Sequence, residues 1–154
     1  MCTKIRIMID RPEPYRAGFA LWSILFIQSG DKAFPDPRWC DATSSVLCIW
    51  MNNVSSLLIG SKESVLLPFM EGDYTLVLTR QPSKTTHMAW FAPGNTILRE
   101  QMIDLSYFVR QLLAAVEKMR NAYPEHRNAP QIRELSNCAD KLRKAFFDSG
   151  VLDY

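Results

Sequence analysis

The side chains in this sequence best suited to chemistry are two histidines and one cysteine. His87 falls on a predicted strand, and His126 falls in a predicted loop between helices. A histidine that acts as a general base needs a nucleophile or an orienting carboxylate within reach, and no local spacing predicts either. Cys40, between Trp39 and Asp41, precedes a predicted helix whose dipole would lower a thiol pKa, but no histidine is tied to it by spacing. We therefore interpret the two histidines as surface or packing residues and Cys40 as part of the packing at the start of the helix.

Compact catalytic and ligand-binding motifs are missing from the sequence. It contains no glycine-rich phosphate loop, HExxH pattern, CxxC pair or GxSxG elbow. Glu71 and Asp73 flank Gly72 and are interpreted as turn residues, although carboxylates from distant positions can still converge on one site. The sequence thus predicts no catalytic, metal or cofactor site and favours a protein that is not an enzyme.

The remaining cysteines follow the same interpretation. Cys2, Cys40, Cys48 and Cys138 lie far apart in a chain that is long enough to fold without disulfides. We expect reduced thiols. Cys48 falls within an apolar helical stripe, which packing explains, whereas Cys138 lies among polar residues of another predicted helix and has no such explanation.

Composition predicts one globular domain over residues 1–154. The chain is 47% hydrophobic and 22% charged, and its 18 basic and 16 acidic residues are mixed along its length. This mixing argues against nucleic-acid binding, which requires a concentrated basic surface. The longest apolar run, Ala17 to Ile27, is much shorter than the roughly 20 residues of a membrane-spanning helix. With no secretory signal at its start, the chain is expected in the cytoplasm, without a membrane partner.

Alternation with a period of two predicts the strands. Ile5, Ile7 and Ile9 alternate with polar residues, and a turn at Pro12 and Pro14 leads to a long second strand over Gly18 to Gln28. The two should form an antiparallel hairpin. Short turns separate four further apolar segments, which predicts an antiparallel meander whose last strand lies at an edge. These segments are Val65–Phe69, Tyr74–Thr79, Thr86–Ala92 and Thr96–Ile103.

Apolar spacings of three and four predict three helices. The first carries residues 46–58, with Asp41 or Ser44 as its N-cap and Gly60 just beyond its end. The second runs from Asp104 to the region before Pro124, and the third covers residues 132–146 and ends near residue 150. The order is ββαββββαα. We expect an α+β two-layer sandwich, with a mostly antiparallel sheet of about six strands covered by the three helices.

Tryptophan side chains are the strongest candidates for a contact surface, because aromatics dominate binding hot spots as well as cores. Trp50 lies in the helical stripe and is expected in the core. Trp90 lies in a predicted strand whose two faces are both apolar, so that one face must point away from the helices. If that face is exposed, Trp90 marks a partner-binding site.

Two segments in the middle third of the chain resemble those of a known group. One contains Trp39-Cys40-Asp41 before a helix, and the other is Phe69-Met70-Glu71-Gly72-Asp73-Tyr74 before a strand. They resemble small uncharacterised bacterial cytoplasmic proteins in which a Trp-x-Asp helix start and a Phe-x-acidic-Gly-x-Tyr turn recur. Many members look like immunity proteins encoded beside polymorphic toxins. Asp73 departs from the group, which has proline there, and toxin-contacting residues vary too much to be transferred.

The resemblance implies a non-catalytic protein-binding protein, most concretely an immunity protein that binds and neutralises a cognate bacterial toxin. Such a protein should form a stable complex with an interface of about 1,600 Å² in total. Two alternatives stay open. An adaptor or secretion chaperone would hold an unfolded client along a strand edge or apolar groove, and a small enzyme would need a site built from sequence-distant residues.

Overall fold

The protein folds into eight strands and three long helices in a computed structural model that describes residues 2–150. The strands are β1 Arg6–Asp10, β2 Ser23–Ser29, β3 Lys32–Phe34, β4 Cys40–Asp41, β5 Ser64–Pro68, β6 Thr75–Arg80, β7 Thr86–Ala92 and β8 Thr96–Ile103. The helices are α1 Thr43–Leu58, α2 Leu105–Asn121, the single 3-10 turn η1 Pro124–His126 and α3 Pro130–Asp148.

The strands form two antiparallel sheets of four strands each. In the first sheet, β2 pairs with β1 along one edge and with the short strands β3 and β4 along the other. The second sheet is the predicted meander β5-β6-β7-β8. The α+β sandwich with three helices is therefore confirmed. The expected single sheet of about six strands is instead divided in two, and the segment before α1, expected as a loop, adds β3 and β4 to the first sheet.

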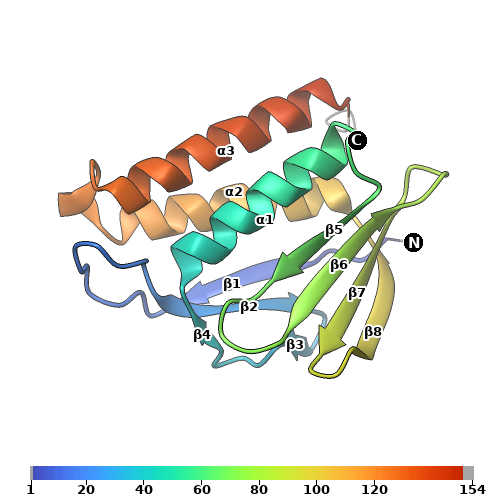
Figure 1. The fold of residues 1–154 in the computed structure, drawn as a ribbon, viewed down its shortest axis with the longest axis horizontal. Helices are drawn as coiled ribbons and strands as arrows, with labels where there is room; N and C mark the ends of the chain where they lie inside the picture. The colour runs from blue at the N-terminus through green and yellow to red at the C-terminus, as the bar shows by residue number, and fades with distance from the viewer. Residues whose placement is uncertain (1, 151–154) are drawn as a thin grey trace.

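The three helices lie together on one side of the two sheets (Figure 1). Helix α1 packs along β5, and α2 packs along β1. Both sheets and all three helices contribute to one hydrophobic core, in which Trp50 and Phe108 are fully buried. The predicted core position of Trp50 is confirmed. Each sheet consequently buries one face and leaves the other without a covering layer.

The second strand is shorter than its apolar sequence suggests. It begins at Ser23, whereas residues 11–22 form a loop in which Gly18 adopts a φ of +80°. Contacts with the end of the chain hold this loop, since the Tyr123 hydroxyl donates to the Glu13 carbonyl (2.6 Å) and Gln131 Nε2 donates to the Phe19 carbonyl (2.7 Å). Hydrogen bonds from Tyr123 and Gln131 to the loop backbone thus hold the loop without a strand partner, while the Phe19 side chain stays exposed.

Helix α1 begins without the expected side-chain cap. Its N-cap is Ala42, and the Ser44 hydroxyl instead accepts a hydrogen bond from the Leu21 amide (2.9 Å). Asp41, the other predicted cap, makes different contacts that are described below. The predicted helix end is confirmed, because Gly60 has a φ of +79° and its amide donates to the Leu57 carbonyl (3.2 Å).

Helix side chains form hydrogen bonds with exposed backbone groups along one edge of each sheet. Edge strands expose unpaired amides and carbonyls that can recruit another chain, and capping those groups reduces this risk. The caps at β1 are Gln111 Oε1, accepting from Ile7 N (3.0 Å), and Lys118 Nζ, donating to Ile9 O (2.6 Å). The caps at β5 are Asn53 Nδ2, donating to Leu66 O, and Trp50 Nε1, donating to Pro68 O (both 2.7 Å).

Candidate functional site

The segments formed by residues 39–42 and 69–74 meet at one buried carboxylate. Asp41 is fully buried, and its two oxygens accept four hydrogen bonds from the segments around it. The donors are Ala42 N (2.7 Å), Trp39 Nε1 (2.9 Å), Met70 N (3.1 Å) and Glu71 N (3.3 Å). We call this arrangement the Asp41 hub. Because a buried carboxylate must be fully hydrogen-bonded, the hub fixes the turn after β5 to the start of α1.

An aromatic cluster surrounds the hub and explains the glycine in the turn. The Trp39 ring packs edge-on against Tyr74, with ring centroids 5.1 Å apart. Gly72 has a φ of +89°, and a Cβ atom added there would lie 3.2 Å from Trp39 Cη2. The residues of these two segments therefore build structure.

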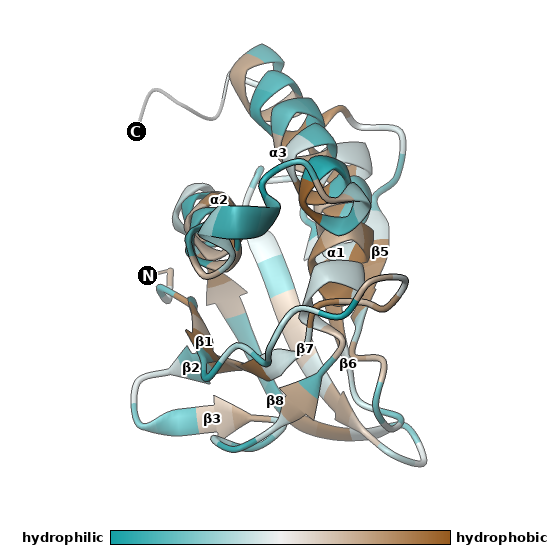
Figure 2. Cartoon of the chain, turned by 90° about the vertical axis from the view of Figure 1, so that its left-hand side faces the viewer, coloured by the Kyte–Doolittle hydropathy of each residue, from teal (hydrophilic) through white to brown (hydrophobic). Residues whose placement is uncertain are grey.

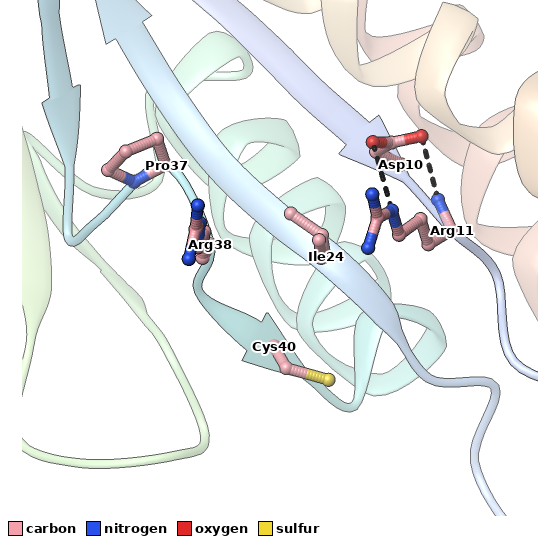
Figure 3. A pocket seen from close by; sticks show the side chains of 6 residues that line it. All are labelled: Asp10, Arg11, Ile24, Pro37, Arg38 and Cys40. Carbon is pink, nitrogen blue, oxygen red and sulfur yellow. Dashed lines mark hydrogen bonds and ion pairs between the residues drawn. The ribbon is translucent and has the colours of Figure 1, made fainter.

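Cys40 lines an open hollow of about 620 Å³ beside the first sheet, together with Asp10, Arg11 and Arg38 (Figure 3). Its side chain is exposed, which corrects the interpretation of a packed residue at the helix start. Partial burial, followed by the negative charges of Glu13, Asp41 and Glu71, raises the pKa of the Cys40 thiol. A raised pKa keeps the thiol protonated at neutral pH and lowers its nucleophilicity.

The other groups around Cys40 are engaged with each other. The Arg11 amide donates to Asp10 Oδ1 (2.9 Å), and the Arg11 guanidinium lies 4.0 Å from Asp10 Oδ2. Figure 3 shows these two residues linked to each other at one side of the hollow. No histidine lines the hollow, so the thiol has no imidazole base in the pocket.

The two histidines lie in separate places. His87 sits on the outer face of the second sheet, with Nε2 3.5 Å from Glu100 Oε1. This cross-strand carboxylate was not apparent from local spacing, because it comes from the neighbouring strand. His126 stacks on Tyr15 with ring centroids 3.8 Å apart, and it anchors the loop before β2 to η1. The structure thus brings neither histidine to Cys40.

Cys138 finds its explanation across the helix interface. All four cysteines carry free thiols. Burial and hydrogen bonding with the neighbouring Cys138 thiol raise the pKa of Cys48 far above its ordinary value. Because α1 and α3 pack closely, Cys138 is a partner of Cys48 in the helix interface.

The structure corrects the choice of Trp90 as a contact residue. Trp90 is only 3% exposed and stacks on Phe34, with ring centroids 5.2 Å apart. The expectation that one apolar face of β7 points away from the helices was sound, but Trp90 lies on the other face. The outward row of β7 contains Phe91, which is half-buried. Because both rows are apolar, the sequence could not tell them apart.

The outer face of the second sheet carries the largest group of exposed apolar side chains among residues 2–150. Leu66, Ile97 and Leu98 are 57%, 50% and 56% exposed. Val77 lies opposite Leu66 in the register, and Phe91 lies opposite Ile97. We call these five residues the outer patch. Isolated exposed apolar residues are ordinary in proteins, whereas a contiguous group on one face indicates a contact surface.

An irregularity in β8 enlarges the outer patch. The register shifts between Trp90 and Phe91, so that Leu98 is an extra residue opposite the β7 pair. Such β-bulges redirect side chains and are frequent next to functional sites. The hydropathy colouring in Figure 2 shows hydrophobic residues on the strands near β8, while much of α2 carries hydrophilic ones. The inner face of the second sheet packs against α1 and, through Trp90 and Phe34, against the first sheet, whereas no described element covers the outer patch.

Comparison with known proteins leaves the family open. No family model, curated protein or solved structure matches the chain. Within residues 2–150, no group of three or more His, Cys, Asp or Glu side chains is arranged to hold a metal ion. None of the helices in the same range has both the length and the apolar run needed to cross a bilayer.

Proposed function

We propose that this protein is a non-catalytic binding protein that uses the outer patch to dock on a folded protein partner. The observation that carries the proposal is the grouping of Leu66, Ile97 and Leu98, each at least half exposed, on one uncovered sheet face. Burying such a face against a partner removes apolar area from water, worth about 25 cal/mol per Å² before the costs of association. Because these side chains remain half exposed in the folded chain, they contribute little to its stability.

The shape of the outer patch favours a folded partner. It extends over four hydrogen-bonded strands, which hold Val77 and Phe91 in fixed positions. A rigid, preorganised surface loses little conformational entropy on binding, which favours tight association. Together with the resemblance described above, this supports an immunity protein that neutralises a toxin domain by occluding it. The partner is then a protein encoded next to this one.

The arrangement of the chemical side chains supports a binder over the enzyme alternative. Cys40 faces a hollow of the first sheet, His87 lies on the outer face of the second sheet, and His126 packs at η1. A nucleophile and its base have to lie within hydrogen-bonding distance, directly or through one water molecule. A secretion chaperone would hold its client along a strand edge or an apolar groove, and side chains cap two of the edges, those of β1 and β5, against an added strand.

A photo-crosslinking experiment tests the proposal. The photoreactive amino acid p-benzoylphenylalanine is placed at Leu98 in the outer patch or, as a control, at Phe147, which is 72% exposed on α3. Each variant is co-expressed with the products of the genes flanking its own gene and irradiated. We expect a one-to-one crosslinked product from position 98 and none from position 147. Crosslinking only from position 147, or from neither position, would contradict the proposal.

Toxin neutralisation needs its own readout. The captured neighbour is expressed alone and together with this protein, and cell growth is followed. We expect the neighbour to arrest growth and co-expression to restore it, and the charged variant Leu98→Lys to restore growth less well than Phe147→Lys. A captured neighbour that does not impair growth would exclude immunity and favour the adaptor. A crosslink that forms only with an unfolded form of the neighbour would favour the chaperone.

A further inference from the structure

One end of the outer patch is hollowed. The hollow has a volume of about 530 Å³, which lies in the range of side-chain and small-ligand pockets. Its apolar lining comes from Leu66, Val77 and Phe91, on three different strands. The turns at the ends of the strands supply the rest of the wall, including Asp73 and Asn95. The hollow therefore has an apolar floor and a polar end.

Asp73 is the one charged residue among those that line the hollow. It is exposed, and its carboxylate makes no hydrogen bond or ion pair with the other described residues. Asp41 differs in this respect, because its carboxylate accepts hydrogen bonds from Trp39, Met70 and Glu71. The end of the hollow thus carries negative charge that no basic side chain of the described chain neutralises.

We propose that the hollow binds an arginine side chain from the protein partner. The proposal rests on the docking function proposed above and names the chemistry of the group that enters this part of the outer patch. The methylene stem of an arginine packs on Val77 and Leu66 while the charged head remains near water. The planar guanidinium can stack on the Phe91 ring and form two parallel hydrogen bonds with the Asp73 carboxylate.

Alternative occupants fit the hollow less well. An acidic side chain would meet Asp73 as a like charge, and an apolar side chain would leave the carboxylate desolvated without a partner. A lysine ammonium would meet the charge but has neither the planar face nor the paired donors of a guanidinium. The chemistry of Phe91 and Asp73 together therefore favours arginine.

An NMR titration with matched peptides tests this inference without the natural partner. The probes are Ac-Leu-Arg-Leu-NH2 and Ac-Leu-citrulline-Leu-NH2, which have nearly the same shape but differ in charge. Amide signals of the isotope-labelled full chain are followed as each peptide is added. We expect weak binding of the arginine peptide, with shifts centred on Asp73, Val77 and Asn95. The citrulline peptide should bind about threefold more weakly, the range expected of one exposed charge pair.

Two variants assign the effect to Asp73. Asp73→Asn should reduce binding of the arginine peptide to the level of the citrulline peptide. Asp31→Asn, the same change at another exposed turn residue, should leave it unchanged. Equal binding of the two peptides, shifts centred elsewhere, or no effect of Asp73→Asn would each overturn the inference.

The peptide result can be separated from the outcome of the docking proposal. If position 98 crosslinks to the partner but the hollow does not distinguish arginine from citrulline, the docking proposal stands and the arginine assignment fails. If the hollow selects arginine but position 98 captures no neighbouring gene product, the arginine site stands and its assignment to that partner fails.

Discussion

Replacing Asp41 by asparagine should destabilise the fold strongly, even though the two side chains have almost the same size. The fully buried carboxylate accepts one hydrogen bond at Oδ1 and three at Oδ2. Asparagine offers a single acceptor oxygen. If this oxygen faces the three donors on the Oδ2 side, the amide NH2 points at the Ala42 amide, and two donors then confront each other.

The size of the loss follows from these contacts. A hydrogen bond to a charged group contributes about 1.5–3 kcal/mol, and an unsatisfied buried donor costs about 1–3 kcal/mol. Because the bonds in a network are not additive, we expect Asp41→Asn to lower the free energy of unfolding by about 3 kcal/mol. Asp41→Ala, which removes all four acceptor contacts, should cost about 5 kcal/mol. A typical domain has only about 5–15 kcal/mol of stability.

Urea unfolding at 25 °C, followed by tryptophan fluorescence, measures this loss. The matched control is Asp36→Asn, because Asp36 is exposed and accepts a hydrogen bond from the Arg38 amide (2.7 Å) in the same loop. We expect the control to lose less than about 1 kcal/mol. A loss below about 1 kcal/mol for Asp41→Asn would refute the assignment of Asp41 as the group that holds the β5–β6 turn to α1.

Three further predictions follow from local geometry. Gly72→Ala should lower the free energy of unfolding by about 2–3 kcal/mol, because the φ of Gly72 is +89° and the new Cβ would lie 3.2 Å from a carbon of the Trp39 indole. The control Gly30→Ala, whose Cβ would lie in open space, should lower it by about 1 kcal/mol. Equal losses in the two variants would contradict the close approach at Gly72. Lys118→Met removes a 2.6 Å hydrogen bond to the β1 edge, and should cost about 1 kcal/mol in urea unfolding and increase light scattering in concentrated solution. In thiol titration at pH 8, Cys40 should react more slowly than free cysteine and Cys48 only on unfolding, because both pKa values are raised. The raised pKa of Cys48 contributes its full stabilisation below the ordinary thiol pKa of 9.0. The free energy of unfolding in urea should therefore fall as the pH rises above 9.0, and should fall less in Cys48→Ala.

Periodicity in the sequence was sufficient for most of the elements. Ile5, Ile7 and Ile9 are buried on one face of the first sheet as the alternation predicts, and the four-strand meander has nearly the expected bounds. Periodicity reports the environment of a segment, and this was misleading before Ser23, where Tyr15 packs against Tyr123 and His126 and Phe19 is exposed. Short strands such as β3 depend on pairing with β2, which local composition does not encode.

The functional surface was only partly accessible from the sequence. Alternation in β7 indicated an apolar face directed away from the helices, but the choice between Trp90 and Phe91 depended on which row meets Phe34 across the core. The role of Asp41 was likewise hidden, because two of its donors lie 29 and 30 residues further along the chain. Contacts of this kind arise only when distant turns meet.

The contrast between edges and faces of the two sheets supports docking of a folded surface over strand addition. Lys118 and Gln111 form hydrogen bonds with backbone groups at the β1 edge, and Asn53 does the same at β5. At the end of β8, the Thr3 amide donates a hydrogen bond to the Met102 carbonyl (2.9 Å). These contacts limit the backbone groups that an added strand could use. The outer patch lacks any comparable protection. A sheet with hydrogen-bonded edge groups and an exposed apolar face fits a partner that presents a complementary face. The charge of Asp73, at one end of the outer patch, would orient that partner.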